Sequence, residues 1–299
     1  MKTREDLTAS RELRAQITAR LGGKLPESIL YHDRSVRALD YYAAGSYEAA
    51  SHGTYRGDDP RLRDIFSISG KNCRNGALSR FSQNVGRQLV LFYTSPLDIV
   101  IDPFAGHNSR MELCWRANRH YFGTDVSEAF MDANFVIRDY LLHERDTDMF
   151  SGDFAAEIVL RECDARLLPW ADAFGDFTIT SPPYYDLEYY GDEPQQLGKA
   201  QTYGDFIREI ARCAEENFRV LKHGAFAVWC VNDFRRAGLF HPFHIDTITA
   251  MMYAGFALHD VAIIDLGPPI ASAFAARTDE KKWLPKRHEY ALIFRKPNL

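Results

Sequence analysis

The sequence has few cysteines and no long apolar run. Its five cysteines lie far apart and form no Cys-x-x-Cys pair, so neither a zinc site nor a disulfide framework is expected; they are Cys73, Cys114, Cys163, Cys213 and Cys230. No stretch approaches the roughly 18 apolar residues of a membrane-spanning helix, and residues 1–20 are charged throughout, without a signal-peptide core. We therefore expect a soluble, cytoplasmic protein without a metal or a membrane partner.

A strong excess of positive charge is also missing. The formal net charge is −5, which excludes the simplest kind of basic nucleic-acid-binding protein. The charge is uneven, however, because residues 65–97 hold no acidic side chain but four basic ones, Lys71, Arg74, Arg80 and Arg87. After Glu280, Glu289 is the single acid among six basic residues, which are Lys281, Lys282, Lys286, Arg287, Arg295 and Lys296. These two basic patches are either solvated faces or contacts for phosphate groups.

The composition is that of an ordinary globular protein, with 46% apolar and 26% charged residues. Residues 1–66 are charged, rich in small and turn residues, and hold at most two helical stretches, at 4–21 and 35–50. We interpret them as an N-terminal accessory region. From 67 to 299 the pattern changes to short apolar runs that alternate with longer amphipathic ones, which is typical of one α/β domain.

Seven apolar runs in this domain predict strands, at 98–102, 121–125, 158–163, 177–180, 225–231, 256–264 and 290–294. Helices are expected between them, at 85–93, 109–118, 128–142, 203–222 and 241–253. This alternation predicts a mostly parallel sheet with helices on both faces, ending in a hairpin with one antiparallel strand. Two long polar stretches, 187–201 and 267–286, follow predicted strands on the side where open α/β sheets bind ligands.

The first chemical motif is Asp102-Pro-Phe-Ala-Gly106, which follows an apolar strand and precedes a helix. Such a turn lets the backbone approach a ligand, and the helix start offers unpaired N–H groups. Asp125 ends the next predicted strand, where a carboxylate can accept hydrogen bonds from both ribose hydroxyls of a nucleoside cofactor. A tight turn and a helix-capping aspartate are the alternative, but the spacing of the two favours cofactor binding.

The second motif is Ser181-Pro-Pro-Tyr184, again directly after a predicted strand. The two prolines fix the backbone and remove two donors, so the Pro182 carbonyl can point into a site. With the Ser181 hydroxyl, it offers two acceptors for the two N–H bonds of an exocyclic amino group, and Tyr184 offers a face for a flat ring. An ordinary Pro-Pro turn is the alternative for this motif alone.

Together and in this order, the motifs resemble the amino-methylating DNA methyltransferases, which methylate cytosine N4 or adenine N6 with S-adenosylmethionine. The likeness covers about residues 70–296. It implies a Rossmann-like methyltransferase fold with a mostly parallel seven-stranded sheet and a terminal antiparallel strand. It also implies that cofactor contacts come from Phe81, Asp102, Phe104, Ala105, Gly106, Asp125 and Asp164 and that the catalytic tetrapeptide is Ser181, Pro182, Pro183 and Tyr184.

The resemblance further implies double-stranded DNA as the partner, with the target base flipped out of the helix. The residues expected at DNA phosphates are Lys71, Arg74, Arg80, Lys281, Lys282 and Lys286. A serine that opens the tetrapeptide favours cytosine N4, with adenine N6 as the nearest alternative. An RNA amino-methyltransferase and a catalytically silent DNA-binding protein also remain open.

The loop after the tetrapeptide allows two interpretations. Asp186 and Glu188 either line the base pocket or are solvated charges, and Tyr185, Tyr189 and Tyr190 either stack on bases or pack on the surface of the protein. Sequence alone does not decide between them.

Overall fold

The computed structural model describes residues 15, 19, 27–33, 81–106, 110–147, 155–267 and 281–298. The predicted helix at 35–50, nearly all of that at 4–21, and three basic residues, Lys71, Arg74 and Arg80, lie outside the described residues.

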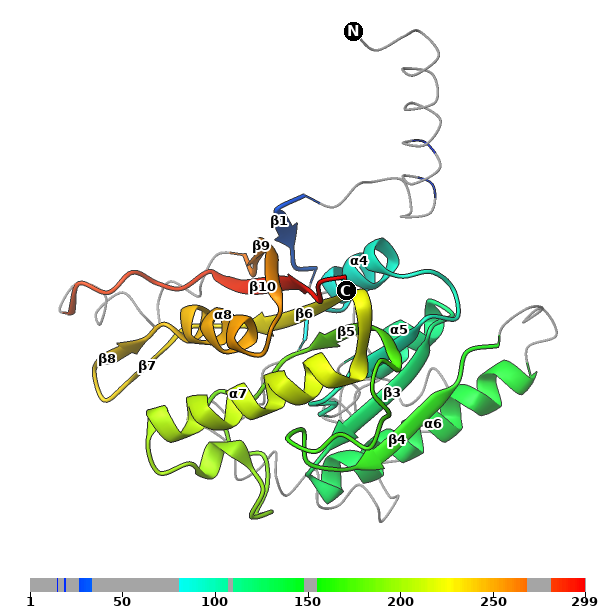
Figure 1. Cartoon of the computed structure of the whole chain (residues 1–299), viewed down its shortest axis with the longest axis horizontal. Helices are drawn as coiled ribbons and strands as arrows, with labels where there is room; N and C mark the ends of the chain where they lie inside the picture. Colours follow the sequence, from blue (N-terminus) through cyan, green and yellow to red (C-terminus); the bar gives the residue numbers. More distant parts are fainter. Residues whose placement is uncertain are drawn as a thin grey trace, which may run out of the picture.

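An eight-stranded sheet with the order β1-β9-β10-β6-β5-β2-β3-β4 forms the centre of the described part (Figure 1). Its strands are β1 (Ile29–Tyr31), β2 (Ile99–Asp102), β3 (His120–Asp125), β4 (Ile158–Glu162), β5 (Gly175–Thr180), β6 (Leu221–Val231), β9 (Ala257–Asp265) and β10 (His288–Arg295). The helices are α4 (Gln83–Tyr93), α5 (Met111–Arg116), α6 (Glu128–Thr147), α7 (Tyr203–Val220) and α8 (Phe243–Tyr253), with a short 3-10 turn η3 (Leu197–Lys199). A separate hairpin pairs β7 (Phe234–Arg236) with β8 (Leu239–His241).

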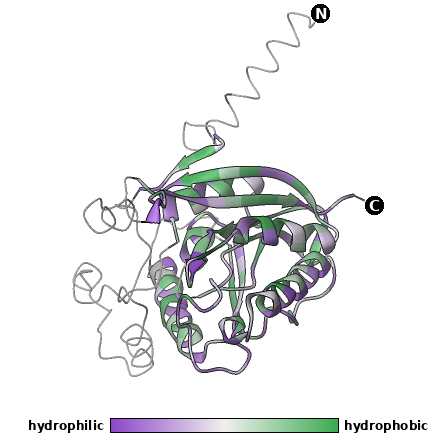
Figure 2. Cartoon of the chain, turned by 90° about the vertical axis from the view of Figure 1, so that its left-hand side faces the viewer, coloured by the Kyte–Doolittle hydropathy of each residue, from purple (hydrophilic) through white to green (hydrophobic). Residues whose placement is uncertain are grey.

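Side chains of the sheet alternate between two cores. On β6, Val228 and Cys230 belong to the core that α4, α5 and α6 cover, whereas Ala227 and Trp229 belong to the core under α7 and α8. Figure 2 shows that the helices carry hydrophilic and hydrophobic residues together, as expected for helices with one face on a core. Helices therefore cover both faces of the sheet.

The predicted fold class is confirmed. All seven predicted strands are present, and β10 is antiparallel to both β6 and β9 while the remaining pairs of this sheet are parallel. An eighth strand was not predicted: β1 lies within residues 1–66 and pairs in parallel with β9, with Ile29 opposite Ile263. The region interpreted as accessory thus adds an edge strand to the sheet, and its boundary at residue 66 stays a prediction.

Helix α7 begins with a capping box, in which the Thr202 hydroxyl accepts from the Asp205 N–H and the Asp205 carboxylate accepts from the Thr202 N–H. The helix ends at Val220, two residues before the predicted end, because Leu221 adopts an extended conformation and starts β6 at once.

Candidate functional site

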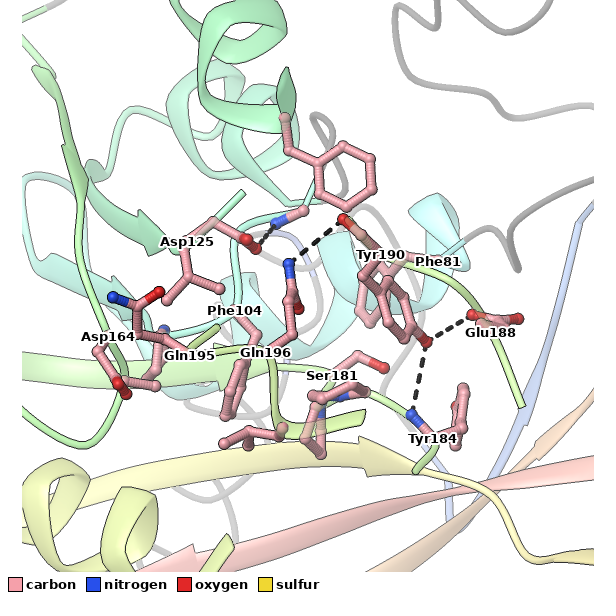
Figure 3. A pocket seen from close by; sticks show the side chains of 18 of the residues that line it. Phe81, Phe104, Asp125, Asp164, Ser181, Tyr184, Glu188, Tyr190, Gln195 and Gln196 are labelled. Atoms are coloured by element: carbon pink, nitrogen blue, oxygen red, sulfur yellow. Dashed lines mark hydrogen bonds between the residues drawn. The ribbon is translucent and has the colours of Figure 1, made fainter. Parts of the chain in front are cut away.

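One pocket lies at the carboxyl ends of β2, β3, β4 and β5, as expected for an open α/β sheet. It encloses about 930 Å³ of space between atoms, part of it open to solvent. Part of its wall comes from the loop after β5, namely Glu188, Tyr190, Gln195 and Gln196 (Figure 3). Leu197 and, from β10, Glu289 also line it. Nine of the predicted residues line it, namely Phe81, Phe104, Gly106, Asp125, Asp164, Ser181, Pro182, Pro183 and Tyr184. The structure thus brings both sequence motifs to one cavity.

Asp102 lies beneath this pocket and does not line it. Its side chain is 0% exposed and forms a salt bridge of 2.7 Å with the Nε of Arg110, which is also buried. The hydroxyls of Thr180 and Tyr121 each donate to the Asp102 carboxylate at 2.7 Å. Because these partners come from β5 and β3, Asp102 links the end of β2 to both neighbouring strands.

Arg110 also connects Asp102 to the turn at residues 103–106. Its guanidinium donates to the Phe104 carbonyl and lies 5.0 Å from the centre of the Phe81 ring. Ala105 is buried, and its N–H donates to the Thr124 carbonyl at 2.8 Å. Asp102 and Ala105, both predicted to contact a cofactor, therefore occupy positions that shape the loop.

Asp125 is held at the end of β3 by backbone donors. Its carboxylate accepts the N–H of Gly106 at 2.8 Å and that of Ser127 at 2.9 Å, while Asn134 donates to the Gly106 carbonyl at 2.6 Å. Burial raises the pKa of Asp125 to about 6, although the N–H bonds from Ser127 and Gly106 lower it. A carboxylate has about four acceptor positions, so two remain for a ligand.

Asp164 lines the pocket beyond the end of β4 and is paired with an arginine that the sequence did not single out. Nη2 of Arg166 lies 2.5 Å from the Asp164 carboxylate, and its Nη1 lies 2.6 Å from Glu209 of α7. Burial opposes ionisation of Asp164, but the hydrogen bonds from Arg166 outweigh it and hold its pKa below the usual value. Arg166 also donates to the Gln195 carbonyl at 3.3 Å, which joins loop 187–201 to this edge.

The tetrapeptide faces the opposite side of the pocket. Pro182 is buried, and the ring of Tyr184 packs edge-on against Phe243 of α8 at 6.4 Å between centroids. The Tyr184 N–H donates to the Tyr190 hydroxyl at 3.4 Å, and this hydroxyl donates to Glu188 at 2.5 Å (Figure 3). Burial raises the pKa of both tyrosines well above the usual value, so both are neutral at physiological pH.

The structure decides several choices that the sequence left open. Glu188 and Tyr190 line the pocket, whereas Asp186 forms a salt bridge of 2.5 Å with Arg236 of β7. Tyr185 packs against aromatic side chains of α7, with its ring 5.5 Å from that of Phe206. The segment 185–190 therefore contributes both to the pocket and to the structure around it.

Glu289 is a pocket residue that sequence analysis missed, because it was counted there as one acid within a basic patch. It lies on β10 opposite Ile264 of β9. Burial raises the pKa of Glu289 to about 7, the positive charge of Lys286 lowers it, and the negative charge of Glu188 adds to the rise. A carboxyl that is partly protonated near neutral pH thus stands beside Tyr184 and Glu188 in the pocket wall.

The described basic residues of the C-terminal patch lie outside the pocket lining. Lys286 Nζ donates to the Asp233 carbonyl at 2.9 Å and lies 3.1 Å from the Asp233 carboxylate, so it is engaged within the protein. Lys281 and Lys282 are exposed, and the Nζ of Lys281 lies 4.8 Å from the centre of the Trp283 ring. Their predicted contacts with DNA stay predictions.

A search of the described residues for three or more His, Cys, Asp or Glu side chains that could hold a metal ion finds none. Among the helices of the same residues, none is long and apolar enough to cross a membrane.

No protein-family model and no curated protein matches the chain. Among solved structures, a SAM-dependent methyltransferase from Methanosarcina mazei is similar at 15% identity and a TM-score of 0.46, covering 71% of this chain and 98% of that one. The cyclase SpnF is similar at 17% identity and a TM-score of 0.48, with 74% and 85% covered. A candidate DNA modification methylase from Thermus thermophilus, in complex with S-adenosyl-L-methionine, shares 29% identity over 46% of this chain and 54% of its own, with a TM-score of 0.35. Since these TM-scores are below 0.5, the likenesses say nothing of the reaction.

If the pocket binds S-adenosylmethionine, as the sequence resemblance implies, Asp125→Ala is expected to weaken that binding by about 1.5 to 3 kcal/mol, the order for lost charge-assisted hydrogen bonds. Because protonation turns an acceptor oxygen into a donor, the affinity of the unaltered protein should also weaken as pH falls below about 6, the raised pKa of Asp125. Titration calorimetry from pH 5 to 8 measures both effects. Unchanged affinity in the folded variant would remove Asp125 from the cofactor site.

Proposed function

We propose that this chain is an S-adenosylmethionine-dependent methyltransferase that acts on the exocyclic amino group of a flipped base in DNA, with cytosine N4 favoured. The observation that carries the proposal is that the turn ending in Gly106, the carboxylate of Asp125 and the tetrapeptide from Ser181 to Tyr184 line one pocket. Under this proposal, the groups that would bind the nucleoside of the cofactor and the groups that would accept hydrogen bonds from the target amine share one cavity.

The side chains that line the pocket fit such a cofactor in donor chemistry. Asp125 would accept the ribose hydroxyls, Asp164 would lie at the adenine, and Phe81 would contact the methionine end. When bound, S-adenosylmethionine supplies an electrophilic methyl group on its sulfonium.

The tetrapeptide would prepare the target nitrogen. Its lone pair is delocalised into the base, and acceptance of its two N–H bonds by the Ser181 hydroxyl and the Pro182 carbonyl directs the lone pair towards the methyl group. The same two acceptors stabilise the positive charge that grows on nitrogen as the N–C bond forms and the S–C bond breaks. Tyr184, neutral and fixed against Phe243, presents an aromatic wall for the flipped base. The proton leaves the nitrogen afterwards, so no strong base is needed before attack.

Product analysis tests this proposal. The purified chain is incubated with isotopically labelled S-adenosylmethionine and with DNA or RNA of the same mixed sequence, and the digested nucleosides are analysed by mass spectrometry. We expect N4-methylcytosine from DNA. N6-methyladenine would refute the base preference, methylated RNA alone would refute the DNA partner, and cofactor binding without product would favour a silent protein.

Glu289 makes the reaction depend on pH. Cytosine and adenine both carry an acceptor ring nitrogen beside the amino group, and a neutral Glu289 would donate a hydrogen bond to it. Since burial raises the pKa of Glu289 to about 7, with Lys286 opposing and Glu188 assisting, kcat/KM should fall as pH rises through that value. Glu289→Gln keeps an N–H donor at all pH values and should remove the fall.

The same titration affects stability. The folded protein keeps a proton on Glu289 that the unfolded chain has already released, so the stability from this group is lost as pH rises through about 7. The difference in Tm between pH 5 and pH 8 should therefore be smaller in Glu289→Gln. Identical pH profiles of activity and of Tm in variant and parent would contradict this role.

A further inference from the structure

The hairpin of β7 and β8 stands apart from the main sheet, at the side of the molecule next to α8 (Figure 1). Phe234 pairs with His241, and Ala237 and Gly238 turn the chain with φ of 50° and 84°. These positive φ values are those of a tight two-residue hairpin turn. The hairpin is a short, well-defined projection between β6 and α8.

Cations and aromatic rings alternate across the hairpin and the segment 281–284. The guanidinium of Arg235 lies 5.0 Å from the centre of the Phe240 ring and 4.7 Å from that of Trp283. Lys281 Nζ lies 4.8 Å from the same Trp283 ring. Arg235 and Lys281 are exposed, and Phe240 is 49% exposed. We call these four residues the cation–aromatic surface.

Segments 234–241 and 281–287 contain no Asp or Glu. Three described acids near these segments are paired with other cations: Asp186 with Arg236, Asp233 with Lys286 and His244, and Asp265 with Arg287. These ion pairs do not include Arg235 or Lys281, the two cations of the surface.

The surface is connected to the pocket. Arg236, on the same strand as Arg235, holds Asp186, which follows Tyr184 by two residues. On the other side, the segment that carries Lys281 and Trp283 continues into β10, where Glu289 lines the pocket. The pocket and the surface are therefore built in part from the same segments of the chain.

We propose that the cation–aromatic surface binds the nucleic-acid strand next to the target base, with Arg235 and Lys281 at phosphates and Phe240 and Trp283 stacked on bases. This rests on the proposed function. Interleaved cations and aromatic rings match a strand that alternates phosphates with flat bases, and a guanidinium held over a ring keeps its N–H edge for phosphate. Lys281, predicted at DNA phosphates, is thus linked through the Trp283 ring to Arg235 of a hairpin that the sequence did not reveal.

Salt-dependent binding tests the proposal. Fluorescence anisotropy with short labelled DNA of mixed sequence, as a duplex and as a single strand, is measured over a range of salt concentrations for Arg235→Ala/Lys281→Ala. For the duplex, loss of two phosphate contacts should reduce the slope of log K against log salt by about two and weaken binding about tenfold or more at low salt. Trp283→Ala should weaken binding of the single strand with little change of slope, since stacking on unpaired bases releases no counterions.

The matched control is Arg138→Ala/Lys222→Ala. It removes the same charge from α6 and from the amino end of β6, at residues that do not line the pocket, and should leave the slope unchanged. Circular dichroism and cofactor affinity show that each variant is folded.

An unchanged slope in Arg235→Ala/Lys281→Ala, with DNA still methylated, would overturn this inference alone. If the parent neither binds nor methylates DNA, both this inference and the DNA part of the proposed function fail. Loss of self-association in Phe240→Ala, with DNA binding unchanged, would assign the surface to a second copy instead.

Discussion

Replacing Asp102 with alanine is expected to lower the free energy of unfolding by about 3 to 5 kcal/mol. The carboxylate is fully buried and is the salt-bridge partner of Arg110, whose side chain is 2% exposed. Its removal leaves a buried guanidinium without its counter-charge and takes the acceptor from the hydroxyls of Thr180 and Tyr121. Both consequences are costly because water cannot reach the site to replace the lost partner.

Urea unfolding, followed by circular dichroism, measures this loss. Asp139→Ala serves as the control, because Asp139 is exposed, pairs with Arg138 at the surface and should change stability by about 1 kcal/mol or less. Asp102→Asn keeps a polar group of the same shape and should lie between parent and alanine variant. Equal midpoints for Asp102→Ala and Asp139→Ala would show that the network does not stabilise the fold.

Nine of the predicted site residues line one pocket, and they could be picked out because their sequence signals are local. Asp102, Asp125 and Ser181 each stand at or directly after a short apolar run, and such runs are readily recognised as strands. In a parallel sheet the carboxyl ends meet at one edge, so three segments far apart in the chain converge there. The pocket formed by Asp125 and Ser181 follows from this rule.

The unpredicted features depend on contacts between distant residues. β1 is three residues long and is a strand because it pairs with β9, so no periodicity marks it. β7 and β8 are equally short, and Ala-Gly is a weak signal for a hairpin turn compared with Asn-Gly. Tertiary pairing, not local propensity, creates these strands.

Side-chain roles were harder to predict than strand positions. The sequence predicted a cofactor contact for Asp102, which stays a prediction, but did not reveal its buried salt bridge with Arg110, eight residues later. Glu289 was read with its basic neighbours along the chain, whereas its pKa depends on burial in a pocket wall built mainly by other segments. Such roles depend on which residues meet in space, and a single sequence does not encode that in its spacing.

Ser181→Ala is expected to slow methyl transfer by about 100-fold or more, the effect of losing one preorganised polar group at a reacting centre. The Ser181 hydroxyl lines the pocket beside Pro182, and we propose that it accepts one of the two N–H bonds of the target amine. Without the Ser181 hydroxyl, only one acceptor binds the target amine. The lone pair of the amine is then less well directed, and the charge that grows on its nitrogen is less stabilised. Because the proposed function assigns Ser181 to the target and Asp125 to the cofactor, cofactor affinity should stay near that of the parent.

Single-turnover kinetics and titration calorimetry separate these two effects. The rate of the chemical step should fall in Ser181→Ala while the Kd for S-adenosylmethionine does not, the opposite of the expectation for Asp125→Ala. Ser95→Ala, which changes an exposed serine in the turn before β2, controls for the substitution itself. If Ser181→Ala keeps full activity, the hydroxyl does not hold the target amine. If the variant loses cofactor affinity together with rate, Ser181 belongs to the cofactor half of the pocket. The Pro182 carbonyl would then be the one remaining acceptor for the target amine.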